Sequence, residues 1–267
     1  MAESVLSQTF YPSPGGQELP LRLFSTAGAP RGAVLLFHGG GWLAGGPAMF
    51  DAHGRMLADR GLLVASAGYR LLGQGAASLA DCVDDAVAAA GFFTALAAGY
   101  GLGPERIGLG GGSAGGQLAL AAVLSRGVGA GALALFNPAL DLRAPLPALT
   151  GSDQPLYTVL GLDAAAAGAL SPMAMVGPGA PPCLIQHGTA DRVVPIGQAR
   201  RFQQAMVAAG NRCRLVEYDG ADHGFFNPGA ANADGVDNAD GVDWCAATAD
   251  VAAGFLLEHL KTARGAG

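Results

Sequence analysis

Leu109-Gly110-Gly111-Gly112-Ser113-Ala114-Gly115-Gly116 is the stretch that decides the fold, because it sets one serine inside a Gly-x-Ser-x-Gly frame. A short apolar run precedes the frame, and an alanine-rich amphipathic run follows it. This order predicts a strand, a sharp bend at Ser113 and a helix. Glycines two positions before and after the serine leave out a Cβ where strand and helix approach closely. The frame therefore predicts a serine raised above a sheet.

The frame needs support from other motifs, because the chain holds 43 glycines among its 267 residues. Upstream, Phe37-His38-Gly39-Gly40-Gly41-Trp42 follows the apolar run 33–36. This pattern is typical of a buried strand that ends in a loop with accessible backbone N–H groups. Such a loop can hold an oxyanion.

Two downstream motifs supply an acid and a base. The strand-like run 184–187 leads into a turn that presents Asp191, and the strand-like run 213–218 is followed by Ala221-Asp222-His223-Gly224-Phe225. The order along the chain is therefore serine, aspartate, histidine, with the glycine loop before the serine. This is the order known for α/β-hydrolases.

Together these motifs resemble the α/β-hydrolase superfamily, and within it the HGGG-bearing esterases related to hormone-sensitive lipase and to bacterial acetyl-xylan and feruloyl esterases. The likeness spans about residues 30–260. It implies carboxylester hydrolysis without a metal or an organic cofactor. It also implies a catalytic set in this chain: nucleophile Ser113, acid Asp191, base His223, and oxyanion donors in the backbone N–H groups of Gly40, Gly41 and Ala114.

We therefore expect a serine carboxylesterase that acts on small acyl esters through an acyl-enzyme, with acetyl and feruloyl esters of carbohydrate as candidate substrates. An amidase, formamidase or peptidase of the same fold stays open, because the same triad cleaves amides. A non-catalytic binding module on this fold is an alternative of another class.

Some nearby residues have competing interpretations. Asp141 follows the predicted strand 132–136 and is an alternative to Asp191 as the acid. We expect His38 to anchor the glycine loop by hydrogen bonding rather than to act as the base. Trp42 is the aromatic residue that we expect to contact substrate, although aromatic side chains near a core are by default packing.

Composition favours one domain over residues 1–267. Charged residues make up 13% of the chain and hydrophobic residues 51%, which is typical of a mostly parallel sheet with helices on both faces. We expect an entry hairpin at 5–11 and 19–24. The further strands are expected at 33–37, 62–67, 106–110, 132–136, 183–187 and 213–218, and the helices at 48–60, 79–98, 115–126, 197–209 and 246–261.

Two segments interrupt this alternation. Residues 139–180 show no βα unit, only proline-rich turns and an alanine-rich patch, so we expect a small lid-like insertion over the carboxyl edge of the sheet. Residues 232–243 repeat Asn-Ala-Asp-Gly-Val-Asp twice. The repeat lacks the spacing and terminal Glu of a calcium loop, so a solvated loop is favoured over a metal site.

Net charge and leader signals limit the partners. The charge of −6 and the 15 scattered Lys and Arg residues exclude a nucleic-acid footprint, which leaves a small-molecule or carbohydrate ester as the expected partner. No signal peptide or apolar span of 18 residues is visible, so we expect no membrane insertion and a cytoplasmic protein, or a secreted one if a leader has been removed. The low charge favours a homodimer as a further expectation. The isolated cysteines predict buried free thiols.

Overall fold

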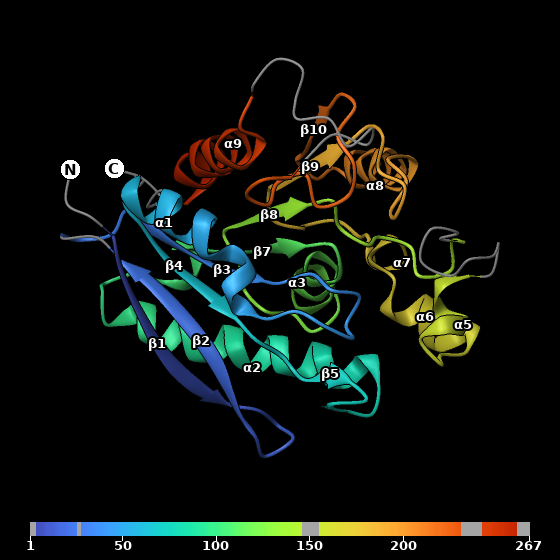
Figure 1. Cartoon of the computed structure of the whole chain (residues 1–267), viewed down its shortest axis with the longest axis horizontal. Coiled ribbons are helices and arrows are strands. Elements are labelled where there is room, and N and C mark those ends of the chain that lie inside the picture. Colours follow the sequence, from blue (N-terminus) through green and yellow to red (C-terminus); the bar gives the residue numbers. More distant parts are fainter. Residues whose placement is uncertain (1–3, 26–27, 146–154, 231–241, 261–267) are drawn as a thin grey trace.

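Within the described residues, an eight-stranded sheet runs through the centre of the molecule in the order β1-β2-β4-β3-β7-β8-β9-β10 (Figure 1). The computed structural model describes residues 4–25, 28–145, 155–230 and 242–260. The strands are β1 (Val5–Pro12), β2 (Glu18–Ser25), β3 (Gly32–Phe37), β4 (Leu62–Ala67), β7 (Ile107–Gly112), β8 (Ala132–Phe136), β9 (Cys183–Gly188) and β10 (Cys213–Tyr218). A separate small pair consists of β5 (Leu71–Leu72) and β6 (Gly75–Ala76).

Strand direction agrees with the predicted mostly parallel sheet. The β1–β2 and β2–β4 pairs are antiparallel, and every later neighbour in the order pairs in parallel. Carboxyl ends of parallel strands meet at one edge of the sheet, where ligands of open α/β sheets bind. The loops that follow β3, β7, β8, β9 and β10 therefore share one edge.

Helices cover both faces of the sheet, as the composition predicts. Figure 1 shows α1 and α9 over one face and α2 and α3 over the other. Alternate residues of β3 belong to different hydrophobic clusters: Leu35 is in the cluster that includes residues of α2, α3 and α8, whereas Leu36 is in the cluster that includes residues of α1 and α9. The helices are α1 (Asp51–Asp59), α2 (Leu79–Ala98), α3 (Ala114–Leu124), α5 (Leu156–Val159), α6 (Ala164–Leu170), α7 (Pro172–Met175), α8 (Gly197–Ala208) and α9 (Trp244–His259), with short 3-10 turns at Pro47–Phe50 and Pro104–Arg106.

Helix α2 has the bounds that its sequence pattern predicts. Ser78 and Asp81 form a capping box at its start, which satisfies backbone N–H groups of the first turn. Its buried residues recur at helical spacing, with Leu79, Val83 and Phe93 among them. The apolar face and the cap are both readable in the sequence, and this explains why the prediction over 79–98 succeeds.

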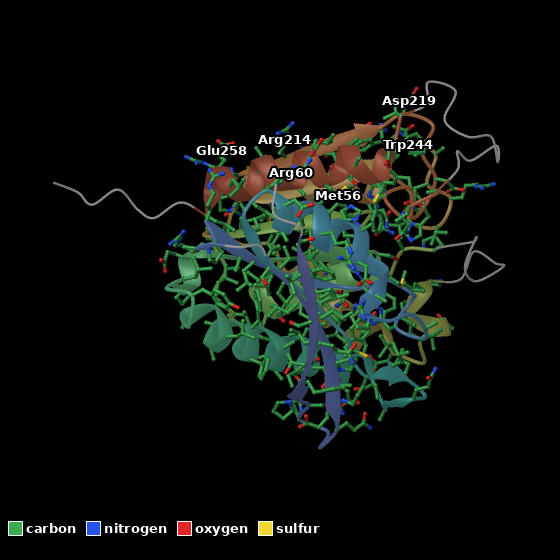
Figure 2. All side chains as sticks on the ribbon, turned by 60° about the vertical axis from the view of Figure 1, so that its left-hand side comes forward. Met56, Arg60, Arg214, Asp219, Trp244 and Glu258 are labelled. Carbon is green, nitrogen blue, oxygen red and sulfur yellow. The ribbon has the colours of Figure 1, made fainter. Side chains whose placement is uncertain are left out.

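Helix α9 and the end of α1 lie side by side on the other face. Arg60, which follows α1, forms an ion pair with Asp250 of α9. Figure 2 shows Met56 and Arg60 next to α9, with Trp244 and Glu258 toward its two ends. This pair is exposed, so we assign the packing of the two helices to their buried apolar residues rather than to charge.

The segment 139–180 contains more helix than the sequence indicated. Helices α5, α6 and α7 lie beyond α3, at the right of Figure 1. Asp163 caps α6 by accepting a hydrogen bond from the Ala166 N–H at 2.7 Å, and α7 packs against α3. Helices of four to seven residues carry too few apolar repeats to give a periodic signal. The role of this segment as a lid stays a prediction.

Candidate active site

Ser113 occupies the sharp bend between β7 and α3. Its φ of 52° and ψ of −116° lie outside the regions that L-residues usually adopt. Backbone hydrogen bonds hold this conformation: Ser113 N–H donates to the Phe136 oxygen at 2.9 Å, and the Ser113 oxygen accepts from Ala139 N–H at 3.1 Å. The end of β8 and the loop that follows it therefore fix the strained serine on both sides of its Cα.

Gly111 and Gly115 of the frame are required by close packing. A Cβ at Gly111 would lie 2.4 Å from the Phe37 oxygen, and one at Gly115 would lie 2.0 Å from the same atom. Real Cβ atoms do not come this close to a carbonyl oxygen. The steric reason that the sequence suggested for the frame is thus observed, and the atom that enforces it belongs to β3.

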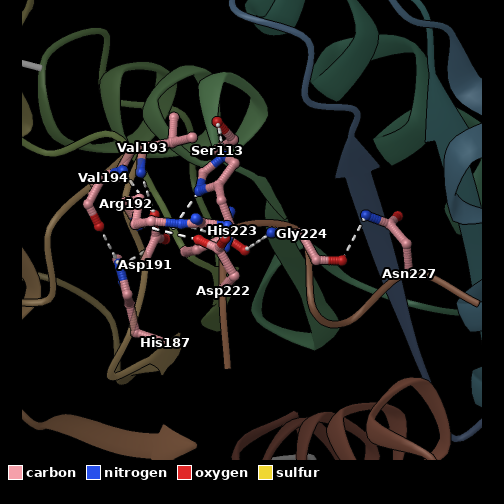
Figure 3. A network of polar contacts seen from close by, with 11 residues as sticks. Ser113, His187, Asp191, Arg192, Val193, Val194, Asp222, His223, Gly224 and Asn227 are labelled. Carbon is pink, nitrogen blue, oxygen red and sulfur yellow. Dashed lines mark hydrogen bonds and ion pairs between the residues drawn. The ribbon is translucent and has the colours of Figure 1, made fainter. Parts of the chain in front are cut away.

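Ser113, His223 and Asp191 meet at the carboxyl edge of the sheet (Figure 3). The Nε2 atom of His223 lies 3.0 Å from Oγ of Ser113, and its Nδ1 atom lies 2.8 Å from Oδ2 of Asp191. Ser113 follows β7, Asp191 lies in the loop after β9, and His223 lies in the loop after β10. An ionised carboxylate only accepts, so Nδ1 carries the proton and Nε2 is free to accept the serine hydroxyl.

Asp191 is held as a buried anion. Its Oδ1 atom accepts the backbone N–H groups of Val193 at 2.9 Å and Val194 at 2.7 Å. Burial alone would raise the pKa of Asp191, but hydrogen bonds from His187 and His223 outweigh it and lower the pKa to about 2. The carboxylate is therefore charged at neutral pH although its side chain is 0% exposed.

His187 belongs to this site although no sequence motif assigns it there. Its Nε2 atom lies 2.8 Å from the Val194 oxygen and 3.1 Å from Oδ2 of Asp191. His187 lies near the end of β9, four residues before Asp191 in the following turn. A four-residue spacing in a loop does not by itself predict a contact, because the contact depends on the geometry of the turn. The sequence alone therefore could not reveal this residue.

The glycine loop after β3 packs directly on the serine bend. A Cβ at Gly39 would lie 3.4 Å from the Cβ of Ser113. Gly40 has a φ of +111°, and a Cβ there would lie 2.0 Å from the Ala44 oxygen, so only glycine fits. In the part of the chain that the structure describes, no acceptor takes the backbone N–H of Gly40, Gly41 or Ala114. These groups are available to a ligand.

His38 is placed as a loop anchor, in agreement with its expected role. Its Nδ1 atom donates to the Gly39 oxygen at 2.7 Å, and its ring stacks on Tyr69 with a centroid separation of 4.3 Å. Burial lowers the pKa of His38 to about 4, which the hydrogen bond to Gly39 only partly offsets. The ring is therefore neutral at neutral pH, and the imidazole that contacts Ser113 is that of His223.

Trp42 lies in the core of the glycine loop rather than on an open surface. Its side chain is 2% exposed, and Nε1 donates to Oε1 of Gln117 at 3.1 Å. Nε2 of the same Gln117 donates to the Leu170 oxygen at 2.9 Å. Gln117 thus connects the glycine loop, α3 and the end of α6. This position assigns Trp42 to fixing the loop, whereas its contact with substrate stays a prediction.

Two other carboxylates near the site, those of Asp141 and Asp222, have partners of their own. Asp141, the alternative to Asp191, accepts a hydrogen bond from Arg143 at 3.3 Å. Asp222 accepts the backbone N–H of His223 at 2.7 Å and pairs with the exposed guanidinium of Arg192. The acid that contacts the ring of His223 is Asp191.

Other expectations concern metals, thiols and membranes. Among the described residues, no three His, Cys, Asp or Glu side chains gather as a metal site, and Cys82, Cys183, Cys213 and Cys245 are free.

Most of the duplication at 232–243 lies outside the described residues. Its last residue, Asp243, accepts from Ala246 N–H at 3.1 Å and caps α9. No helix in the described ranges is long and apolar enough to cross a membrane.

Comparison with solved structures gives close matches over nearly the whole chain. Native esterase 2 of the Planctomycetes species Thermogutta terrifontis has 33% identity and a TM-score of 0.78, with 97% of this chain and 94% of that chain covered. The same esterase with propionate bound has 33% identity and a TM-score of 0.77, with coverage of 97% and 96%.

Curated proteins give more distant matches. A probable isoprenylcysteine alpha-carbonyl methylesterase of Oryza sativa subsp. japonica is 31% identical over 215 residues, which are 71% of this chain and 50% of that protein. Another probable isoprenylcysteine alpha-carbonyl methylesterase, from Arabidopsis thaliana, is 27% identical over 229 residues, which are 77% of this chain and 48% of that protein. The chain thus spans about half the length of these relatives. A family model described as alpha/beta hydrolase fold matches residues 34–227. The family match, together with the sheet order and the bend at Ser113, shows that the chain belongs to the α/β-hydrolase fold family.

Proposed function

We propose that this chain is a serine carboxylesterase that hydrolyses small acyl esters through an acyl-enzyme. The observation that carries the proposal is the contact chain from Ser113 Oγ to Nε2 of His223 at 3.0 Å, and from Nδ1 of His223 to the buried carboxylate of Asp191 at 2.8 Å. A serine hydroxyl is a weak nucleophile, and this arrangement is the one that activates it.

The reaction begins when Oγ of Ser113 attacks the ester carbonyl and Nε2 of His223 takes the hydroxyl proton. Asp191 stabilises the resulting imidazolium, because its carboxylate is already ionised and fixed by two backbone N–H groups. His223 then gives the proton to the departing alcohol. A water molecule, activated by the same ring, releases the acyl group and restores the free serine.

Negative charge on the carbonyl oxygen needs donors beside Ser113. We assign this role to the backbone N–H groups of Gly40, Gly41 and Ala114, which have no acceptor among the described residues. The Gly39 backbone packs against the serine, so the glycine loop lies next to the reacting atom. One such donor contributes about 3 kcal/mol to transition-state stabilisation in other enzymes.

Small acyl groups are the favoured substrates. The similar esterase of Thermogutta terrifontis is described with propionate and with butyrate bound, which are short acyl groups. The curated relatives are described as probable methylesterases, a name that specifies a small alcohol rather than the acyl group. Acetyl and feruloyl esters of carbohydrate remain candidates from the motif resemblance. We also propose that the segment 139–180 acts as the lid that selects the acyl group, since Gln117 links it to the glycine loop.

Replacement of the nucleophile tests the proposal. Ser113→Ala should fold and lose p-nitrophenyl acetate turnover as well as labelling by a fluorophosphonate. Ser125→Ala is the matched control, because this serine only donates to the Ala121 oxygen at the end of α3. Turnover that survives in Ser113→Ala while Ser125→Ala behaves in the same way would refute the proposal.

A substrate panel separates the remaining alternatives. Acyl esters from acetate to laurate, acetylated xylan and methyl ferulate report the acyl preference. Anilides and formamides in the same panel identify an amidase or formamidase, because the triad also serves amides. A wild-type protein that neither turns over any member of the panel nor reacts with the fluorophosphonate would instead be a binding module on this fold.

A further inference from the structure

Asn137 follows β8 directly and has an unusual backbone conformation. Its φ is 35°, and it is one of the non-glycine residues with positive φ in the described chain. Its side chain is completely buried. Asparagine tolerates this left-handed region better than most residues, but glycine adopts it without steric cost. The presence of a side chain at this position therefore needs a reason other than backbone shape.

The backbone around Asn137 is attached to the serine bend. The residue before it, Phe136, accepts the Ser113 N–H, and the Ala139 N–H donates to the Ser113 oxygen. Asn137 N–H itself donates to the Gln186 oxygen of β9 at 2.8 Å. This short segment is thus fixed to the strands that carry the nucleophile and lead to the acid.

The side chain of Asn137 reaches the loop that carries the base. Its Oδ1 atom accepts the backbone N–H of Gly224 at 3.1 Å, and Gly224 is the residue next to His223. The Gly224 oxygen accepts in turn from Nδ2 of Asn227 at 2.8 Å (Figure 3). Asn137 therefore joins the serine bend to the histidine loop through one hydrogen bond.

The amide nitrogen of Asn137 shows that an asparagine at this position is unfavourable in one respect. Nδ2 of Asn137 is buried and has no partner among the described residues. A buried donor without a partner destabilises the folded state, because the group has lost its hydrogen bonds to water. Glycine would avoid this penalty and fit the backbone equally well, but it would leave the Gly224 N–H without its acceptor. The bond to Gly224 is thus the feature that accounts for an asparagine here.

We propose that Asn137 is a positioning residue that holds the imidazole of His223 against the hydroxyl of Ser113. The inference rests on the proposed esterase function, because positioning matters only if Ser113 and His223 react together. Asn137 does not touch the reacting atoms through any hydrogen bond in the structure. It acts on the rate through the Gly224 backbone.

Two variants separate the hydrogen bond from the backbone shape. Asn137→Gly keeps the left-handed conformation and deletes the acceptor, whereas Asn137→Asp keeps an acceptor of the same length. With p-nitrophenyl acetate, kcat of Asn137→Gly should fall about tenfold or more, as expected for the loss of one hydrogen bond that holds the base, and KM should change by less than about twofold. Asn137→Asp should recover most of kcat.

A spectroscopic measurement reports the same effect without turnover. The proton shared by Nδ1 of His223 and Asp191 gives a far-downfield resonance in proton NMR when it is protected from exchange. This resonance should broaden or vanish in Asn137→Gly and persist in Asn137→Asp. Asn211→Ala is the control for loss of a buried asparagine, because Asn211 bonds to Ala180 and Gly177 away from the site. It should keep kcat and the resonance even if it melts earlier.

The outcomes are distinguishable. Unchanged kcat and an unchanged resonance in folded Asn137→Gly would overturn the inference and leave the esterase proposal intact. A loss of kcat that follows the fall in Tm equally in Asn137→Gly and Asn211→Ala would overturn it as well, since that is a structural effect. If wild-type protein shows no turnover and no fluorophosphonate labelling, the proposed function fails, and the resonance alone then decides whether Asn137 positions His223.

Discussion

The Nε2 atom of His187 lies 3.1 Å from Oδ2 of Asp191, the same oxygen that faces His223. The Val194 oxygen, 2.8 Å from Nε2, is also an acceptor, so this nitrogen must carry a proton. Asp191 is thus surrounded by donors on both carboxylate oxygens. The charge that orients His223 is itself stabilised by a second histidine from the end of β9.

Removal of the second histidine should make Asp191 easier to protonate. In His187→Phe the carboxylate loses one donor, so the pKa of Asp191 should rise and acid unfolding should begin at a higher pH than in wild type. His187→Gln keeps an N–H donor and should lie between the two. Circular dichroism during an acid titration measures the midpoints. Identical midpoints in all three proteins would show that His187 does not stabilise the charge.

The depressed pKa of Asp191 predicts how stability depends on pH. Its ionised form stabilises the fold above the unfolded-state pKa near 3.8, and this contribution disappears as pH falls toward the folded-state pKa of about 2. The free energy of unfolding should drop by roughly 2 kcal/mol over this range because of Asp191. Urea unfolding at several pH values should show a smaller drop in Asp191→Asn. Asp59→Asn, at an exposed site on α1, should behave as wild type.

The steric requirement at Gly115 predicts opposite effects for two Gly→Ala changes. Gly115→Ala should prevent the native packing of the serine bend, because its Cβ would lie 2.0 Å from the Phe37 oxygen. Gly91→Ala, in the middle of α2, meets nothing within 4 Å and should stabilise the protein by about 0.5–1 kcal/mol. Thermal melts of both variants measure this. Two variants of equal stability would contradict the steric interpretation.

Gln117 should contribute to stability and to the order of the glycine loop. Gln117→Met has a similar volume but leaves the indole N–H of Trp42 and the Leu170 oxygen without their partners. We expect a loss of about 2 kcal/mol or more in urea unfolding, together with lower kcat. Gln203→Met, which removes one longer contact of 3.3 Å to the Cys213 oxygen, is the control. Comparable losses in the two variants would argue against a special role for Gln117.

The sequence predicted the sheet and the residues that meet on it, because these depend on patterns along short stretches. The apolar runs gave β4, β8 and β10 with their observed bounds, and the spacing of Gly111, Ser113 and Gly115 gave the bend. What it could not give are contacts between loops. His187 on Asp191, Asn137 on Gly224 and Gln117 on Trp42 join segments whose approach is set by the whole sheet. The short helices α5 to α7 were missed because they lack a full apolar repeat.

The conformation of Ser113 is imposed entirely from outside the residue. The Phe37 oxygen, the backbone of Gly111 and Gly115, and the bonds to Phe136 and Ala139 define the bend, and the serine hydroxyl takes no part in it. The backbone conformation at position 113 therefore does not depend on the reactive oxygen atom. A cysteine at position 113 should therefore keep the same backbone conformation and direct its thiol as the serine directs its hydroxyl. The fold could thus hold a different nucleophile with an unchanged backbone.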